Sequence, residues 1–149
     1  MPNGPMGDNE ATITVPDGFV LHDRRSPVTA PWEPIYARHE ADQVRLGLEI
    51  RTPHTNSRGL LHGGVIAAIT DNAMGLSVAT VLRAARGETG TSPITASLSI
   101  DYLGRAALGQ WLEIDTQFVH LGKQQAVAQA LVTADGQIIA RANATFRVG

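Results

Sequence analysis

Residues 62–85 read HGGVIAAITDNAMGLSVATVLRAA, and this stretch decides the fold. It is too long for a single strand and apolar on nearly every side, which is typical of a buried helix. Two glycines stand at its start and one acid, Asp71, stands near its middle. We therefore predict one long buried helix that begins at His62-Gly63-Gly64 and ends near Ala85.

The apolar character of this stretch also raises the question of a membrane span. Residues 63–82 carry a single formal charge, and twenty such residues are long enough to cross a bilayer. That charge is Asp71, with Asn72 beside it, in the middle of the stretch where an acid is costly in lipid. The stretch is also rich in Ala, Gly and Thr rather than Leu, so a buried helix is the better interpretation and no membrane partner is expected.

Period-2 alternation of apolar and polar residues predicts strands on both sides of the helix. The apolar sets are Val44, Leu46, Leu48 and Ile50; Ala96, Leu98, Ile100 and Tyr102; Leu112, Ile114, Thr116 and Phe118; and Ile138, Ala140, Ala142, Ala144, Phe146 and Val148. A Gly-rich connection at residues 87–93 follows the helix, and a further strand runs from the Gly122-Lys123 turn through Val132 to the Asp135-Gly136 hairpin turn. A strand, one helix and four strands joined by short turns imply an α+β fold with an antiparallel sheet packed on a single helix.

The first forty residues lack this periodicity. They are Pro-rich, and the opening MPNGPMGDNEAT has neither the basic start nor the apolar stretch of a secretory signal, so a loosely packed terminus is expected. The aromatic residues Phe19, Trp32 and Tyr36 are expected to dock on the body of the protein. We predict an irregular N-terminal extension at residues 1–40, docked on or trailing from the body, and one domain at residues 41–149.

Composition excludes several classes of function. Twelve basic and fourteen acidic residues give a net charge of -2, with no run of like charge that would attract nucleic acid. The absence of cysteine excludes disulfides, thiol nucleophiles and cysteine-containing zinc sites, and the five histidines lack metal-ligand spacing. We expect a cytoplasmic protein with no metal and no cofactor.

Asp71 is the residue most indicative of chemistry. An ionised carboxylate inside an apolar helix is costly unless it is paired, hydrogen-bonded or retained for function. The structural alternative is an acid that faces solvent or an arginine across an interface. Its apolar neighbours Ile66, Ile69 and Met74 leave little of the helix polar, which favours a pocket or an interface.

The glycine pair at the start of the helix is a second candidate feature. Backbone N–H groups there lack intrahelical partners and can polarise a carbonyl, although glycines are also needed for a tight turn. Gly63 and Asp71 are eight residues apart, or about 12 Å along one helix at 1.5 Å per residue. If they share a site, the acid must come from a second copy of the chain.

Other catalytic patterns are absent from the sequence. It has no G-x-S-x-G elbow, no Walker loop and no G-x-G-x-x-G after a strand. Ser77 lies within the helix and is interpreted as a small packing residue, and His62 alone indicates little.

The motif Asn56-x-x-Gly59-x-x-His62-Gly63-Gly64, followed by Asp71 on the helix, resembles the PaaI-like group of hotdog-fold acyl-CoA thioesterases. The resemblance covers about residues 44–148, and the combination is far more specific than any of its parts. It implies a hotdog fold, in which an antiparallel sheet wraps around one long central helix. It also implies self-association into dimers, often paired as tetramers, with active sites at the dimer interface.

The same resemblance implies a role for five residues. Gly63 would donate its backbone N–H to the thioester carbonyl, and Asp71 of the neighbouring subunit would act as general base or nucleophile. Asn56 and His62 would shape the site near the thioester. The hydroxyl of Thr95 would orient Asp71 or the water.

The function hypothesis is hydrolysis of small aryl- or medium-chain acyl-CoA thioesters, with CoA as part of the substrate. Such a reaction needs carbonyl polarisation and an activated water but no metal or redox cofactor. The alternative is a non-catalytic acyl-CoA sensor or binding module on the same fold, and a hotdog hydratase fits less well. The identity of the acyl group is left open.

Overall fold

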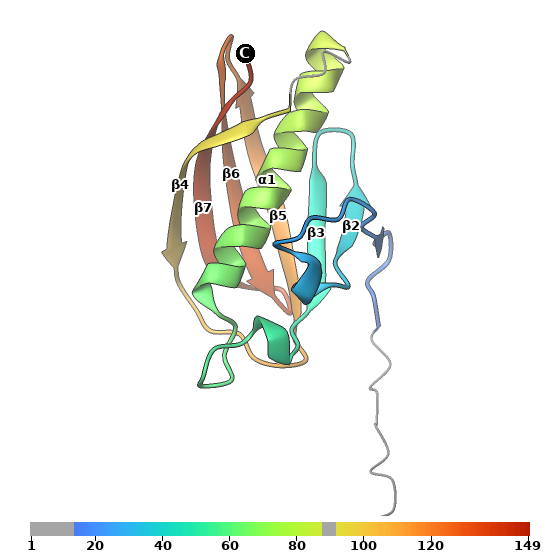
Figure 1. The fold of residues 1–149 in the computed structure, drawn as a ribbon, viewed down its shortest axis with the longest axis vertical. Coiled ribbons are helices and arrows are strands. Elements are labelled where there is room, and N and C mark those ends of the chain that lie inside the picture. Colours follow the sequence, from blue (N-terminus) through green and yellow to red (C-terminus); the bar gives the residue numbers. More distant parts are fainter. Residues whose placement is uncertain (1–13, 88–91) are drawn as a thin grey trace, which may run out of the picture.

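One long helix lies in the curve of one antiparallel sheet in the computed structural model, which describes residues 14–87 and 92–149 (Figure 1). Helix α1 spans Gly63–Arg86, as predicted to within one residue at its C-terminal end. The strands are β1 Val20–Leu21, β2 Tyr36–His39, β3 Val44–Glu49, β4 Ile94–Tyr102, β5 Trp111–Leu121, β6 Gln125–Ala134 and β7 Gln137–Arg147, with short 3-10 helices η1 Ala30–Trp32 and η2 Thr52–His54. The order across the sheet is β1-β2-β3-β5-β6-β7-β4, and all neighbours are antiparallel. The predicted α+β architecture is confirmed.

Helix α1 is capped at both ends. At its start the Nδ1 atom of His62 accepts the backbone N–H of Gly64 at 2.8 Å, which satisfies one of the N–H groups that a helix start leaves unpaired. At its end Gly87 adopts a left-handed φ of 73°, and its N–H donates to the carbonyl of Arg83 at 2.8 Å. The local sequence therefore sets both ends of the helix.

The face of α1 that packs against the sheet accounts for its apolar composition. The buried helix residues are Val65, Ile66, Ile69, Thr70, Ala73, Met74, Ser77, Val78 and Leu82. By length and composition the helix could cross a membrane, but 56% of its apolar window is buried inside the protein. Small residues face it from β6 and β7, including Ala128, Ala140, Ala142 and Ala144, and they let the sheet curve closely around the helix.

Ser77 ties the middle of the helix to the sheet. The N–H of Val44, the first residue of β3, donates to Ser77 Oγ at 3.1 Å, and the Ser77 hydroxyl donates to the carbonyl of Ala73 at 2.9 Å. Ser77 is fully buried. Its interpretation as a structural residue is supported, and it also satisfies a buried backbone donor.

Register shifts in three strand pairs interrupt the side-chain alternation that the sequence predicts. The shift in β4, between Thr95 and Ser97, puts Thr95 on the same face as Leu98 and Tyr102 rather than on the opposite one.

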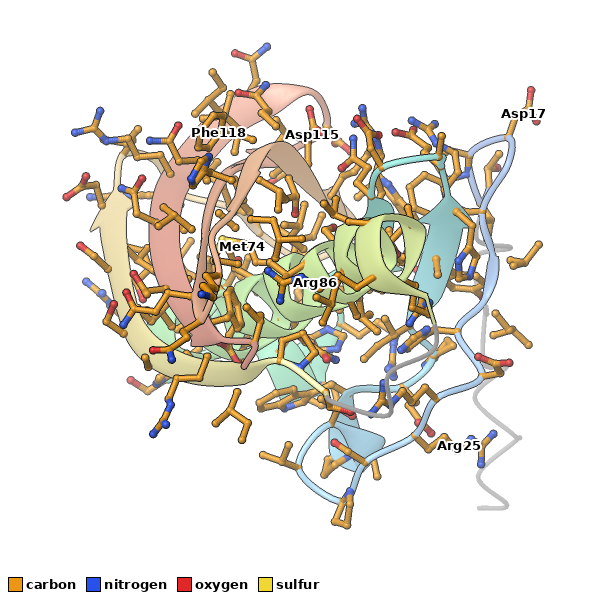
Figure 2. All side chains as sticks on the ribbon, turned by 90° about the horizontal axis from the view of Figure 1, so that it is seen from above. Asp17, Arg25, Met74, Arg86, Asp115 and Phe118 are labelled. Carbon is orange, nitrogen blue, oxygen red and sulfur yellow. The ribbon has the colours of Figure 1, made fainter. Side chains whose placement is uncertain are left out.

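The register of β5 and β6 shifts between Thr116 and Phe118, so Phe118 is 49% exposed on the outer face of the sheet (Figure 2). A third shift, at Thr133, leaves Ile138 52% exposed while Ile139 is buried. The assignment of Phe118 and Ile138 to the inward face was therefore wrong, because an inserted residue moves the following side chains to the other face.

The N-terminal segment is more regular than expected. Strand β2 pairs with β3, and the two-residue β1 pairs with β2, at one edge of the sheet. The expectation of irregular structure was wrong for β2, whose single buried residue, Ala37, gives no apolar alternation. As predicted, the aromatic residues dock on the body: the rings of Phe19 and Tyr36 contact Trp111 with centroid distances of 5.3 and 5.9 Å. The loosely packed terminus expected at residues 1–13, and residues 88–91 of the Gly-rich connection, lie outside the described residues.

Candidate active site

Asp71 lies half-buried on the side of the helix that the sheet leaves open. Its Oδ1 atom accepts a hydrogen bond from the Thr95 hydroxyl at 2.7 Å. Thr95 is the second residue of β4, and its pairing with the buried Phe146 of β7 places it on the inner face of the sheet. Among the described residues no cation lies within ion-pair distance of Asp71. The carboxylate is therefore oriented by a hydroxyl and remains available to a ligand.

The start of the helix presents one free donor. Gly64 donates to the His62 side chain, while Val65 and Ile66 donate to the His62 carbonyl at 3.0 and 3.2 Å. The N–H of Gly63 has no acceptor within the part of the chain that the structure describes. His62 thus uses the second glycine and leaves the first one open. A donor at this position also carries the positive end of the helix dipole.

Tyr102 is a site residue that the sequence analysis missed. Its hydroxyl donates to the carbonyl of Gly63 at 2.7 Å. Its ring also lies so close to Gly63 that an added Cβ would come within 3.2 Å of the ring carbon Cζ. Tyr102 was assigned only to the apolar face of its strand, and nothing in the sequence indicated that this face passes over the start of the helix. Thr95 and Tyr102 therefore connect the two ends of β4 to Asp71 and Gly63.

Asn56 organises the loop before the helix. Its Oδ1 atom accepts the N–H groups of Arg58 and Leu60 at 2.9 and 3.2 Å, and the turn is completed by Gly59 with a left-handed φ of 72°. A side-chain acceptor for nearby backbone N–H groups is the usual way in which asparagine stabilises such a turn. The structure brings Asn56 into contact with this loop rather than with Asp71 or Gly63.

His54 anchors the same loop to the N-terminal segment. It is fully buried, its Nδ1 accepts the N–H of Arg51 at 2.9 Å, and its Nε2 lies 2.9 Å from the carbonyl of Trp32. Burial lowers the pKa of His54 below its usual value, so the neutral ring, protonated on Nε2, satisfies both contacts. The His54 carbonyl in turn accepts the N–H of His62 at 2.9 Å, which links this anchor to the helix cap.

An open cavity of about 370 Å³ begins at Asp71 and continues along the helix. It is lined by residues of three segments, the loop after β1, the open face of α1 and the approach to β4: Arg24, Ser26, Asp71, Asn72, Gly75, Leu76, Ala79, Leu82, Arg83, Ser92, Pro93 and Thr95, together with Phe146 of β7. In the described ranges, 14–87 and 92–149, no group of three or more His, Asp or Glu side chains could hold a metal ion. The site offers a carboxylate, a hydroxyl and a separate backbone donor.

Comparison with known proteins identifies the family. The model of the thioesterase superfamily matches residues 58–140, which contain His62, Gly63, Asp71 and Thr95. The chain belongs to the thioesterase superfamily. The prediction of a thioester hydrolase is confirmed at this level.

Two relatives of this superfamily member have informative names. A Pseudomonas aeruginosa protein, whose name describes it provisionally as an esterase, is 30% identical over 137 residues, which cover 91% of this chain and 98% of the relative. Human acyl-coenzyme A thioesterase 13 is 32% identical over 104 residues, which cover 68% of this chain and 70% of the relative.

Solved structures confirm the hotdog fold and the PaaI-like resemblance. A Streptococcus mutans protein bound to acetyl-CoA superposes with a TM-score of 0.70 at 30% identity, covering 87% of this chain and 95% of that one. A single-residue mutant of the phenylacetic acid degradation protein PaaI from Thermus thermophilus superposes with a TM-score of 0.65 at 24% identity, covering 76% of this chain and 91% of that one.

Proposed function

We propose that this thioesterase superfamily member hydrolyses small aryl- or medium-chain acyl-CoA thioesters in a site formed by two copies of the chain. The names of two similar proteins support CoA thioesters as the substrate class, because one is an acyl-CoA thioesterase and the other was solved with acetyl-CoA. The proposed roles of the site residues are those that the family resemblance implies, and their geometry in this chain supports them.

The observation that carries the proposal is the arrangement of Asp71 and Gly63. Asp71 is held by Thr95, and Gly63 keeps a free N–H, but eight residues of helix separate them by about 12 Å. One carbonyl group cannot contact both in one chain. Two helices lying side by side in opposite directions would bring Asp71 of one copy to Gly63 of the other, twice per dimer.

Each group then has a defined chemical task. The Gly63 N–H donates to the thioester carbonyl oxygen and stabilises the negative charge that develops there. Asp71 either removes a proton from water, whose oxygen bonds to the carbonyl carbon, or attacks that carbon itself. Collapse of the tetrahedral intermediate breaks the C–S bond and releases the CoA thiolate, which takes up a proton. In the second route, water then hydrolyses the acyl–Asp71 anhydride.

The edge strand β4 supports the dimer that this site requires. It is nine residues long, it pairs only with β7 among the described strands, and nearly all of its residues are exposed. Its exposed apolar residues include Ile94, Leu98 and Tyr102. A long open edge with apolar side chains is a ready template for pairing with another chain.

The decisive experiment is thiol release from a panel of acyl-CoA thioesters by wild type and by Asp71→Asn. We expect wild-type turnover and none by the variant, because the amide can neither accept the proton nor attack. Asp17→Asn, at an exposed turn distant from the helix in Figure 2, is the matched control and should stay fully active.

The outcomes separate the enzyme from the acyl-CoA sensor or binding module. Stoichiometric binding of acyl-CoA by wild type without thiol release would favour the binding module. Full activity of Asp71→Asn, with a folded oligomer confirmed by sedimentation, would reject the catalytic role of Asp71.

A further inference from the structure

The cavity beside Asp71 is lined by two arginines that the hydrolysis of a neutral acyl group does not need. Arg24 comes from the loop after β1, and Arg83 from the last turns of α1. Neither lies within ion-pair distance of a carboxylate in the part of the chain that the structure describes. The neighbouring Arg25, by contrast, pairs with Glu33 at 3.8 Å and does not line the cavity.

The charges of the residues that line the cavity differ along its length. Asp71 and Thr95 lie at one end. Arg83 is twelve residues further along the same helix, which is about 18 Å at 1.5 Å per residue, and helical side chains tilt back toward the N-terminus. Its guanidinium can therefore lie nearer to Asp71 than its Cα does.

Apolar residues form the lining between these two ends. Leu76 and Ala79 lie on the exposed side of the helix, and the buried Leu82 and Phe146 complete the wall. Two serines add polar groups to the lining. Ser26 lies in the same loop as Arg24, and Ser92 lies just before β4. A carboxylate, a hydrocarbon surface and two cations in one cavity are the pattern of a site for an acyl chain that ends in an anion.

We propose that this cavity receives the acyl group and that Arg24 and Arg83, the two cations in its lining, bind a carboxylate at the end of the acyl chain. The preferred substrates are then CoA monothioesters of dicarboxylic acids. The inference rests on the proposed thioesterase function, since it assumes that the thioester carbon lies at Asp71. The phosphates of CoA are the other source of anionic groups near the cavity, and the test below separates the two.

The test compares thioesters that differ only at the end of the chain. Hexanoyl-CoA is paired with adipoyl-CoA, and decanoyl-CoA with sebacoyl-CoA, and kcat/KM is measured for wild type, Arg24→Met and Arg83→Met. We expect wild type to prefer the carboxylated partner of a pair. Each substitution should lower kcat/KM for that partner by about ten- to a hundredfold, the usual effect of losing a charged hydrogen bond, and leave the neutral partner unchanged.

Two controls make the result specific. Arg25→Met removes a charge adjacent to Arg24 but outside the cavity, and it should change neither substrate. Arg83→Lys keeps the charge and should retain part of the preference.

Each alternative gives a distinct result. Equal losses on neutral and carboxylated substrates would assign the arginines to the phosphates of CoA and overturn the inference. Hydrolysis of the neutral thioesters with no preference for carboxylates in wild type would also overturn it, while leaving the thioesterase function intact. If wild type hydrolyses none of the four thioesters, the inference fails, and if it hydrolyses no aryl-CoA thioester either, the proposed function fails with it.

Discussion

The two edges of the sheet differ in length, exposure and chemistry. At one edge, β1 has two residues, and the segment around it is closed by packing of Phe19 and Tyr36 on Trp111. At the other edge, β4 has nine residues, and nearly all of them are exposed. Short edge strands offer few unpaired backbone groups, whereas long open ones offer many. The comparison favours the β4 edge as the place where the proposed second copy of the chain would pair.

The edges also differ in what they contribute to the site. The inner face of β4 supplies Thr95 to Asp71 and Tyr102 to Gly63, so this strand holds both elements of the proposed chemistry. The contribution of the β1 edge is Arg24 and Ser26, from the loop that follows β1, at the side of the cavity. Changes to β4 should therefore affect turnover much more than changes to β1.

The largest effect is expected from a charge on the open edge. Leu98→Asp places a carboxylate on β4, where the second copy would pack, and we expect a monomer without thioesterase activity. Leu21→Asp makes the same change on β1 and should leave both assembly and turnover as in wild type, because Leu21 is already 66% exposed at the closed edge. Sedimentation velocity and thiol release measure the two properties. A fully active Leu98→Asp monomer would contradict the shared site, provided that circular dichroism shows both variants to be folded.

The next largest effect is expected at the contact of β4 with Asp71, the proposed base or nucleophile. Thr95→Ala removes the hydroxyl that donates to Asp71, and a hydrogen bond to a charged group corresponds to a loss of about tenfold or more in kcat. Thr95→Ser keeps the hydroxyl and should restore most of the activity. An unchanged kcat in Thr95→Ala, measured with saturating substrate, would show that Asp71 needs no orientation from β4.

A smaller effect is expected at the other end of the same strand. Tyr102→Phe removes the hydrogen bond to the Gly63 carbonyl but keeps the ring that covers this glycine. The loss in stability should be about 1 kcal/mol or less, with a few-fold decrease in turnover, because the start of the helix is held less firmly. Urea unfolding combined with kinetics tests this. A larger loss of turnover in Tyr102→Phe than in Thr95→Ala would show that the contact with Gly63 matters more for turnover than the contact with Asp71.

The smallest effect on turnover is expected from His54, on the side of the N-terminal segment. Because burial holds the pKa of His54 below 6.5, the folded chain binds fewer protons than the unfolded chain once the pH falls below that value. The free energy of unfolding should therefore decrease as the pH falls through 6.5 and level off below the folded pKa. His54→Gln, which does not titrate, should reduce this dependence when urea unfolding is measured across the same range. A dependence equal to that of wild type would exclude His54 as a source, leaving His22, whose pKa burial also lowers, as the other described candidate.

The parts of the fold that depend on local sequence pattern could be predicted from the sequence. The two glycines before an apolar run located the start of α1. Alternation located β3, β4, β5 and β7, and the turns at Gly122-Lys123 and Asp135-Gly136 located β6. Asp71 and Thr95 were paired in advance only because the motif resembled a known family. Their hydrogen bond joins residues that are 24 positions apart, and no local pattern specifies such a contact.

The remaining features depend on tertiary register. An inserted residue in β5 and another in β7 turned Phe118 and Ile138 outward, and alternation alone does not reveal a bulge. Strand β2 was missed because it is formed by pairing with β3 rather than by an apolar pattern of its own. Tyr102 was missed as a site residue because its role depends on where β4 passes the helix.

The buried Ser77 fixes the position of α1 along its own axis relative to the sheet. Its link to Val44 lies between the two ends of α1, so the helix cannot slide along its axis without breaking a buried contact with the sheet. A slip of one helical turn, about 5.4 Å, would carry Asp71 beyond the reach of the Thr95 hydroxyl. A serine that takes no part in the proposed chemistry thus fixes the axial position of the helix, and with it the position of the Asp71 carboxylate.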